Sequence, residues 1–369
     1  MLAILSNVTV VSLIESTYKK VNEEIYTSSG YNTWVQELIT DQFSESKPEA
    51  VFLVLYGREL IGDAASDWEE VKLTLDQYLA TIKTFCEEHR DIPLFVSSLD
   101  IQHDKILPFT SSRLEDKIES YWRSGLEDMG VPVLEIAEIA RNIGRDKFYS
   151  KRMWYLGSIP FSMSGEKAIA EEIGRAWNAL KGNRKKCLVL DLDNTLWGGV
   201  IGEDGLQGIE LSTTKEGSRF RDFQKRIKDL KDQGVLLTIV SKNNEEDAME
   251  AIREHPDMVL REDDFVIIKA NWEPKPVNIQ NIAKELNIGL DSLVFIDDNP
   301  IERESVKNAL PEVIVPDFPK DTSTLESFAI EISKRYFPVL KLTDEDLNKT
   351  NQYKVEQKRN EIKQKSISI

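Results

Sequence analysis

The sequence predicts an α/β fold in two domains, and three observations support this. The length of 369 residues suits two domains, since domains commonly span roughly 100–200 residues. Short apolar runs alternate with longer amphipathic stretches, a pattern typical of doubly wound parallel sheets covered by helices. The polar segment "GNRKK" begins at Gly182 and separates two series of such elements. We therefore predict domains at residues 1–182 and 183–340, followed by a charged tail at 341–369.

The first domain is expected to be an α/β unit with a parallel sheet. Its apolar runs predict strands at residues 2–7, 50–56, 92–98 and 131–136. Apolar residues recur at helical spacing up to His89, and Asp67 is placed to cap the N-terminus of that helix. A last helix is expected from Ser164 to Gly182.

The second domain repeats this alternation with clearer signals. Strands are expected at residues 187–193, 235–241, 265–270, 292–298 and 313–316. Helices are expected between them, at residues 220–233, 245–255, 276–286 and 301–310. The stretch 341–369 is charged nearly all round, which indicates a solvated helix or a frayed tail.

The charge of the chain bears on its partners. The net charge of −17 argues against a nucleic-acid-binding protein, because a phosphate backbone would be repelled. One helix nevertheless carries a basic run, which is either a local basic patch or simply a solvated face. The run consists of Arg219, Arg221, Lys225, Arg226 and Lys228.

The composition also bears on location. Only two cysteines occur, far apart in the sequence, so we expect no disulfide framework and a reducing cytoplasm. No run approaches the roughly 20 apolar residues that span a bilayer, so we expect no membrane partner. The apolar opening segment lacks the features of a secretory signal. The histidines show no ligand spacing, so none is expected to bind metal; they are His89, His103 and His255.

Reactive side chains stand where three predicted strands of the second domain end. The stretch "KCLVLDLDNTLWGG" runs from a buried strand into Asp191 and Asp193. Ser241 ends the next strand, and Asp297 and Asp298 end a later one. The carboxyl ends of parallel strands lie at one edge of a sheet, where functional groups collect. Because neighbouring carboxylates repel and their burial is costly, we expect a bound cation, a phosphoryl group, or both.

A lysine completes this set. Either Lys269 or Lys275 precedes the last of these strands, and Lys275 is preferred because "EPKP" begins a helix, whereas Lys269 lies within a predicted strand. A carboxylate can attack a phosphoryl group when a divalent cation and a positive side chain screen its charge. Oxygen donors of this kind suit Mg²⁺. The alternative is a buried salt-bridge cluster with a structural role.

The ordered set resembles the haloacid dehalogenase-like (HAD) superfamily of aspartyl phosphotransferases. "DLDNT" resembles its first motif, Ser241 in "LTIVS" its second, a lysine its third and "VFIDDN" its fourth. One branch, the FkbH-like proteins, is more similar still. That similarity rests on "KCLVLDLDNTLWGGVIGEDG", "SKNN", "NWEPKPVNI" and "VFIDDNPIERESV". It covers the second domain densely and the first domain weakly.

The resemblance implies a role for each motif residue. Asp191 would be the nucleophile that forms an aspartyl-phosphate, and Asp193 would protonate the leaving oxygen and then activate water. Ser241 would hydrogen-bond the transferring phosphoryl group, and Lys275 would neutralise it. The implied Mg²⁺ ligands are Asp191, Asp193 through its backbone carbonyl, Asp297 as a helper and Asp298 directly. The implied substrate-binding residues are Thr195, Trp197, Gly198, Lys242 and Asn243.

The spacing of the motifs leaves room for a flap but not for a large inserted lid domain. The flap is expected at "WGGVIGEDG", whose glycines permit tight turns. Trp197 and Trp272 either line the pocket or pack in the core. Cys187 begins the nucleophile strand and is a buried inert thiol or, by resemblance to FkbH-like proteins that load glyceryl units onto carrier proteins, an acyl relay.

The first domain weakly resembles the SGNH hydrolase fold but lacks its catalytic residues. "LSNVT" places Val8 where the nucleophilic serine would stand, and Gly57 lacks the Asn-Asp that would follow it. "SIPFSMSGEKAIA" lacks the expected Asp and His. Ser6 is a displaced candidate without a base. We therefore expect a catalytically degenerate scaffold or lid.

These observations together favour a Mg²⁺-dependent phosphatase or phosphotransferase acting on a small phosphorylated metabolite. One alternative is a glyceryl transferase that passes a phosphoglycerate-derived unit to an acyl carrier protein. Another, of a different class, is a non-catalytic scaffold in a biosynthetic assembly. The complete set of acids argues against the scaffold.

Overall fold

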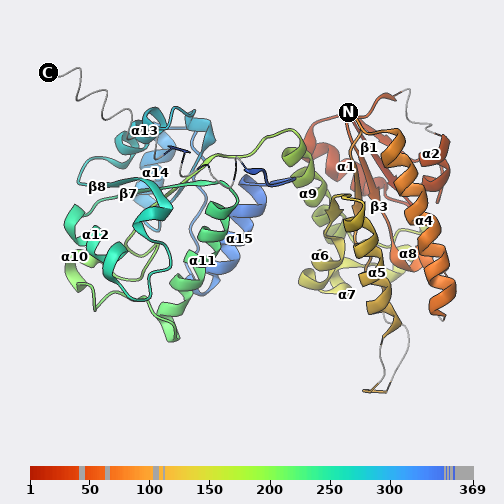
Figure 1. The fold of residues 1–369 in the computed structure, drawn as a ribbon, viewed down its shortest axis with the longest axis horizontal. Coiled ribbons are helices and arrows are strands. Elements are labelled where there is room, and N and C mark those ends of the chain that lie inside the picture. The colour runs from red at the N-terminus through yellow and green to blue at the C-terminus, as the bar shows by residue number, and fades with distance from the viewer. Residues whose placement is uncertain are drawn as a thin grey trace. The chain divides into compact units, whose positions relative to one another are not determined.

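The computed structural model describes residues 1–40, 46–62, 67–102, 108–110, 113–344, 346, 349, 352 and 353. The chain divides into two compact units, Met1–Trp177 and Asn178–Ile369 (Figure 1). Each unit holds a parallel sheet with helices, which confirms the predicted α/β fold class. Most of the predicted tail, and His103, lie outside the described residues.

The first unit contains a five-stranded sheet in the order β2-β1-β3-β4-β5. Its strands are β1 (Leu2–Ser6), β2 (Ile25–Thr27), β3 (Val51–Val54), β4 (Leu94–Ser97) and β5 (Val133–Leu134). Neighbouring strands pair in parallel, and the order is that of flavodoxin-like folds. Strands β1, β3 and β4 are buried along their whole length, which explains their continuous apolar runs.

Helices surround this sheet. They are α1 (Val11–Val21), α2 (Trp34–Thr40), α3 (Gly57–Ile61), α4 (Trp68–Glu88), α5 (Leu114–Asp128), α6 (Ile136–Ile143), α7 (Arg145–Phe148), α8 (Lys151–Gly157) and α9 (Met163–Leu180). Asp67 caps α4 as predicted, because its side chain accepts a hydrogen bond of 2.8 Å from the backbone N–H of Glu69.

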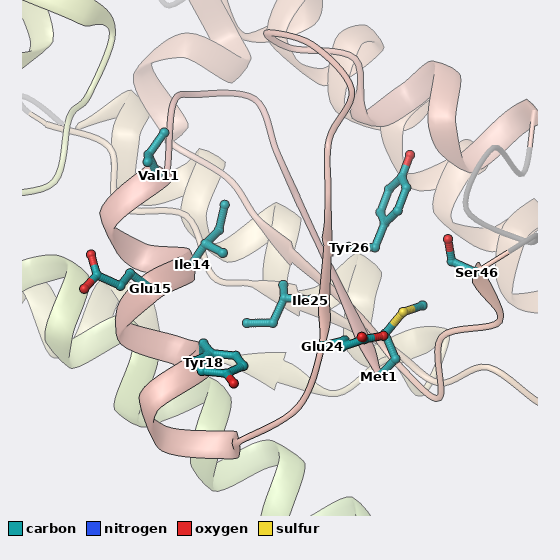
Figure 2. Close-up of a pocket in the computed structure, with 9 residues that line it drawn as sticks. All are labelled: Met1, Val11, Ile14, Glu15, Tyr18, Glu24, Ile25, Tyr26 and Ser46. Carbon is teal, nitrogen blue, oxygen red and sulfur yellow. The ribbon is translucent and has the colours of Figure 1, made fainter.

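A groove of about 630 Å³ lies beside α1 and the edge strand β2 (Figure 2). Its lining residues are Met1, Val11, Ile14, Glu15, Tyr18, Glu24, Ile25, Tyr26 and Ser46. Among the described residues most of these side chains are apolar, and the two acidic ones are Glu15 and Glu24.

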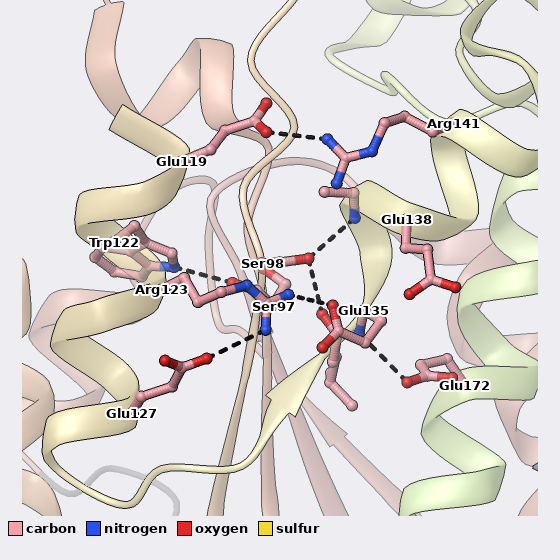
Figure 3. A network of polar contacts seen from close by, with 12 residues as sticks. Ser97, Ser98, Glu119, Trp122, Arg123, Glu127, Glu135, Glu138, Arg141 and Glu172 are labelled. Atoms are coloured by element: carbon pink, nitrogen blue, oxygen red, sulfur yellow. Dashed lines mark hydrogen bonds and ion pairs between the residues drawn. The ribbon is translucent and has the colours of Figure 1, made fainter. Parts of the chain in front are cut away.

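The carboxyl ends of β4 and β5 are tied to helices by a polar network (Figure 3). The indole Nε1 of Trp122, on α5, donates to the carbonyl oxygen of Ser97 over 3.0 Å. The hydroxyl of Ser98 donates to the carbonyl oxygen of Leu134 and accepts from the backbone N–H of Ala137. These buried groups satisfy one another, so the network holds the fold together.

The second unit contains a four-stranded sheet in the order β8-β7-β6-β9. Its strands are β6 (Cys187–Leu190), β7 (Leu236–Ser241), β8 (Phe265–Ala270) and β9 (Leu293–Ile296). Neighbouring strands pair in parallel. Strand β6 lies between β7 and β9, so the three strands that end in reactive residues are direct neighbours.

The strand that was expected at residues 313–316 does not form. Ile314 forms only an isolated parallel bridge with Val294. Pro316 is the last residue of this segment, and Pro311 lies two residues before its start. Proline has no backbone N–H to donate to a ladder, so the pairing cannot extend into a strand.

The helices of the second unit are α10 (Ile201–Asp204), α11 (Ser218–Asp232), α12 (Glu245–Glu254), α13 (Lys275–Glu285), α14 (Pro300–Ala309) and α15 (Leu325–Tyr336). Four single-turn 3₁₀ segments are also described: Lys215–Gly217, Glu262–Asp264, Leu290–Ser292 and Thr322–Thr324. None of the described helices is long and apolar enough to cross a membrane.

The basic run lies on α11, where acidic neighbours pair with several of its members. Arg226 contacts both Asp229 and Glu326, and Lys225 lies 2.7 Å from Asp222. These pairs favour the solvated helix face over a free basic patch.

Candidate active site

Asp191 follows β6 directly, at the carboxyl edge of the second sheet. Its backbone N–H donates to the carbonyl oxygen of Ile296 over 3.0 Å, which continues the pairing of β6 with β9. The side chain is buried, and its Oδ1 lies 2.9 Å from Nζ of Lys275. The same Nζ lies 2.6 Å from Oδ2 of Asp297. A single buried lysine thus joins two buried carboxylates.

The choice between the two candidate lysines has a clear geometric outcome. Lys275 is the first residue of α13, and its side chain is buried beside Asp191. Lys269 lies within β8, and its Nζ pairs with Glu285 over 2.7 Å. The structure therefore brings Lys275, and not Lys269, to the carboxylates.

Three carboxylates form a group suited to a metal ion. Asp191, Asp297 and Asp298 each offer an oxygen, and these oxygens lie within 4.8 Å of one another. Oδ1 of Asp191 is buried and, apart from the ion pair with Lys275, receives no hydrogen bond from the described residues. Hard oxygen ligands of this kind are those that Mg²⁺ takes. The donor set fits the expected cation.

The burial of these carboxyls changes their protonation. Burial raises the pKa of Asp191 from 3.8 to about 6, and Asp297 adds to the rise while Lys275 opposes it. Burial likewise raises the pKa of Asp298 from 3.8 to about 6. Burial alone would lower the pKa of Lys275, but the two carboxylates beside it raise that pKa above its ordinary value. The lysine therefore stays charged.

The carboxylate of Asp193 lines the same cavity and is oriented by hydrogen bonds. Oδ1 accepts from the indole Nε1 of Trp197 over 2.9 Å and from the backbone N–H of Ile201 over 3.0 Å. Oδ2 accepts from Nδ2 of Asn243 over 2.8 Å. The side chain of Asp193 is thus held from two directions.

Ser241 is the last residue of β7, and Asn243 lies two residues after it. Ser241 is buried and lines the same cavity as Asp191. Nδ2 of Asn243 also reaches Oγ of Ser241 over 3.2 Å. Asn243 therefore links two of the predicted catalytic side chains, although it was expected to bind substrate.

The flap begins directly after Asp193. Asn194 has a left-handed backbone with φ of 54°, and its Oδ1 accepts from the N–H of Gly199 over 3.0 Å. Gly198 and Glu210 exchange backbone hydrogen bonds of 3.1 and 2.7 Å, which close the flap into a hairpin. A Cβ at Gly198 would come within 2.9 Å of Phe220, so a larger residue would not fit there. The buried hydroxyl of Thr195 accepts from the N–H of Asp298 over 3.3 Å.

A cavity of about 200 Å³ opens over these residues. Its lining residues are Asp191, Asp193, Asn194, Val200, Ser241, Lys242, Lys275, Asp298, Asn299 and Glu302. Nζ of Lys242 pairs with Oε1 of Glu302 over 2.6 Å at the cavity wall. Glu302 was not foreseen, because an acidic residue in the first turn of a helix is also what a helix N-terminus favours.

A second unforeseen residue is Arg303, on α14. Its guanidinium donates to the backbone carbonyls of Asp297 and Asp298, over 2.9 and 2.6 Å. It therefore fixes the loop that carries both acids. A contact with backbone carbonyls leaves no signal in the sequence.

The structure shows where the two candidate tryptophans and Cys187 lie. Trp197 is fully buried within the core, whereas Trp272 is 69% exposed and donates to Oδ1 of Asn244. Cys187 is fully buried at the opposite end of β6 from Asp191. Burial raises the pKa of its thiol to about 12, which agrees with an inert thiol.

At the carboxyl edge of the first sheet, Ser6 makes hydrogen bonds with backbone groups. Oγ of Ser6 donates to the carbonyl oxygen of Val54 over 2.7 Å and accepts from the N–H of Val8. Both partners are backbone groups of the sheet edge, so Ser6 has a structural contact where a nucleophile would need a base.

No model of a protein family matches this sequence, and a search of curated proteins finds no match. One solved structure is similar over nearly the whole chain: the N-terminal part of the protein BF1531 from Bacteroides fragilis, containing a phosphatase domain and complexed with Mg. The identity is 27%, the TM-score is 0.83, and the match covers 92% of this chain and 94% of that one. The chain therefore has the predicted two-domain α/β fold, which it shares with a protein that contains a phosphatase domain. The bound Mg and the carboxylate group of this chain agree with the cofactor expected from the sequence.

Weaker likenesses involve about half of the chain. A lipase/acylhydrolase from Enterococcus faecalis matches at 13% identity and a TM-score of 0.35, over 47% of this chain and 94% of that one. A catalytic mutant of Axe2, an acetylxylan esterase from Geobacillus stearothermophilus, matches at 12% identity and a TM-score of 0.34, over 47% of this chain and 92% of that one.

Proposed function

We propose that this protein is a Mg²⁺-dependent phosphatase or phosphotransferase of the FkbH-like type, which forms an aspartyl-phosphate on Asp191. The observation that carries the proposal is the position of Asp191, which lines a cavity beside a buried lysine at 2.9 Å and two further carboxyls. The similar Bacteroides fragilis structure, with its phosphatase domain and Mg, supports the reaction class and the cation.

The first proposed step transfers the phosphoryl group to the protein. A carboxylate oxygen of Asp191 attacks phosphorus, and the bond from phosphorus to the leaving oxygen breaks with its electron pair on that oxygen. Asp193, which also lines the cavity, gives the leaving oxygen a proton. Lys275 holds Asp191 in place and offsets negative charge, and the hydroxyl of Ser241, which lines the same cavity, would donate to a phosphoryl oxygen.

The second step returns the carboxylate of Asp191. Asp193, now ionised, takes a proton from water while the water oxygen attacks phosphorus, and inorganic phosphate leaves. Bound Mg²⁺ would polarise the phosphoryl oxygens and offset their charge, held by Asp191, Asp297 and Asp298. Both oxygens of Asp297 already contact Lys275 and the N–H of Asn299. Asp298 is therefore the ligand with more freedom to meet a cation.

The size of the cavity supports a small substrate. Its volume is about 200 Å³, whereas drug-sized ligands occupy sites of roughly 300–1,000 Å³. A phosphoryl group with a few further atoms fits such a space. We therefore propose a small phosphorylated metabolite as the substrate.

Transfer of a glyceryl unit to an acyl carrier protein is the alternative we propose to test beside it. It gains no support from Cys187, because this thiol is fully buried and its pKa is raised to about 12. An acyl relay needs an accessible thiolate. Hydrolysis of a phosphate ester is thus the preferred reaction.

The test compares the whole protein with Asp191→Asn and with Asp232→Asn, a matched change at an exposed position on α11. Phosphate release is measured from p-nitrophenyl phosphate and from phosphoglycerates, each with Mg²⁺. We expect wild-type rates for Asp232→Asn and no release for Asp191→Asn. Turnover by Asp191→Asn at the wild-type rate would remove Asp191 as the nucleophile. Adding an acyl carrier protein, followed by intact-protein mass spectrometry, separates hydrolysis from transfer, because only transfer adds a glyceryl unit to the carrier.

A further inference from the structure

The indole of Trp197 makes a contact that core packing alone does not require. The ring is 0% exposed and packs in the same core cluster as Leu190 and Phe223. Its Nε1 nevertheless points at the one acid that the proposed reaction uses for proton transfer, Asp193, at 2.9 Å. The ring cannot touch a substrate, because it is fully buried. Any effect of Trp197 on the reaction must therefore act through Asp193.

The hydrogen bonds to Asp193 distinguish its two oxygens. An ionised carboxylate offers about four lone-pair positions, two on each oxygen. On Oδ1 both positions are taken, by Nε1 of Trp197 and by the N–H of Ile201. On Oδ2 one position is taken, by Nδ2 of Asn243. One position on Oδ2 is thus left to carry a proton.

We propose that Trp197 is a positioning residue that saturates Oδ1 of Asp193, so that the transferred proton is carried by Oδ2. This inference rests on the proposed function, in which Asp193 protonates the leaving oxygen. Without the indole N–H, Oδ1 regains a free position, and the carboxyl can hold its proton on the wrong oxygen or rotate. Asn243 opposes rotation of the same carboxyl, because its Nδ2 donates to Oδ2 and also reaches Oγ of Ser241 at 3.2 Å.

The test uses two phosphate esters that differ in their need for a proton. p-Nitrophenolate is stable enough to leave without protonation, whereas the phenolate of phenyl phosphate leaves more readily when protonated. The quantity compared is kcat/KM, which covers only the steps up to departure of the leaving group and so excludes the later hydrolysis of the aspartyl-phosphate. The ratio of the two kcat/KM values isolates the proton donor, since effects on phosphate binding cancel.

Trp197→Phe keeps an aromatic ring, removes the N–H donor and leaves a small cavity in the core. We expect kcat/KM for phenyl phosphate to fall by about tenfold, a part of the roughly 10²–10⁴-fold that general acid catalysis contributes, with little change for p-nitrophenyl phosphate. Trp122→Phe is the matched control, because Trp122 is also fully buried and donates its indole N–H to the carbonyl of Ser97 (Figure 3). This control should lose stability without changing the ratio.

Equal losses on both esters in Trp197→Phe would overturn the inference and leave Trp197 a core residue. If Trp197→Phe does not fold, Asn243→Ala decides: a larger loss on phenyl phosphate supports the positioning of Asp193, and equal losses overturn it. Asp193→Asn separates this inference from the function on which it rests. If the ratio of the two kcat/KM values is unchanged in Asp193→Asn, Asp193 is not the proton donor and the proposed function is wrong on this point. If the ratio changes in Asp193→Asn but not in Trp197→Phe, Asp193 is the proton donor and Trp197 does not position it.

Discussion

Nζ of Lys275 lies 2.9 Å from Oδ1 of Asp191, and both side chains are buried. A buried carboxylate is unstable without a partner, and a buried ammonium is too. The pair therefore keeps a carboxylate in a buried position, where electrostatic interactions are stronger than in water. The same lysine lies 2.6 Å from Asp297, so the geometry of the whole group depends on it.

Lys275→Met should unfold more easily than the wild-type protein and should lose phosphate release. Removing one partner of a buried ion pair costs about 3–5 kcal/mol, because the remaining charges stay buried without compensation. The matched control is Lys269→Met, whose ion pair with Glu285 is partly exposed and should contribute only about 0–1 kcal/mol. Urea unfolding in chelator measures both. Equal losses of stability in the two variants would contradict the role of Lys275.

The metal-free protein should become less stable as pH rises from about 4 to about 6. The pKa values of Asp191 and Asp298 are raised from 3.8 to about 6 in the folded chain. In this window the folded state holds protons that the unfolded state has released, so the free energy of unfolding falls with pH. Thermal unfolding in chelator across pH 4–7 measures the slope. An unchanged slope in Asp298→Asn would contradict the raised pKa of this carboxyl.

Binding of Mg²⁺ should depend on pH in the opposite sense. The carboxylates must lose their protons to bind the cation, so added Mg²⁺ should raise the melting temperature above about pH 6 and have little effect at pH 5. Asp298→Asn should reduce this rise, because Asp298 is one of the three grouped carboxyls. Chelation should also stop turnover, and Mg²⁺ should restore it. Full activity in excess chelator would rule out the cation.

Ser6→Ala should leave phosphate-ester turnover unchanged. Its Oγ donates to the carbonyl of Val54 in a buried contact, so the change should cost about 1 kcal/mol of stability and no activity. Phosphate release and urea unfolding are measured on the same preparation. Hydrolysis of short acyl esters by the wild-type protein, lost in Ser6→Ala, would show that the first unit is a working hydrolase.

The sequence predicts this fold well where strands are apolar and buried, and it misses one short edge strand, β2. Strands β6 and β7 are apolar along their length, so their runs stand out. Strand β2 is three residues long and only partly buried, and it leaves no such signal. The segment 313–316 is apolar yet forms a single bridge, because the prolines at its end and before its start prevent further pairing.

Some features of the candidate site could be predicted from the sequence, and others could not. Residues at strand ends, such as Asp191 and Ser241, were predictable because parallel topology gathers them at one edge. The bond from Trp197 to Asp193 and the contacts of Arg303 with two carbonyls were not. They depend on the direction of side chains from a flap and a helix, which no periodicity encodes. The choice of Lys275 over Lys269 needed the placement of α13 as well as its predicted start.

Detection of a phosphorylated Asp191 tests the proposed reaction most directly. The whole protein is mixed with Mg²⁺ and p-nitrophenyl phosphate, quenched in acid within the first turnovers, and analysed as intact protein and then as peptides. We predict a gain of one phosphoryl group in the peptide that contains Asp191, and no gain in Asp191→Asn. Two results would contradict an aspartyl-phosphate at this position. One is a phosphoryl group on another residue, and the other is turnover by the wild-type protein without more phosphoryl label than Asp191→Asn carries.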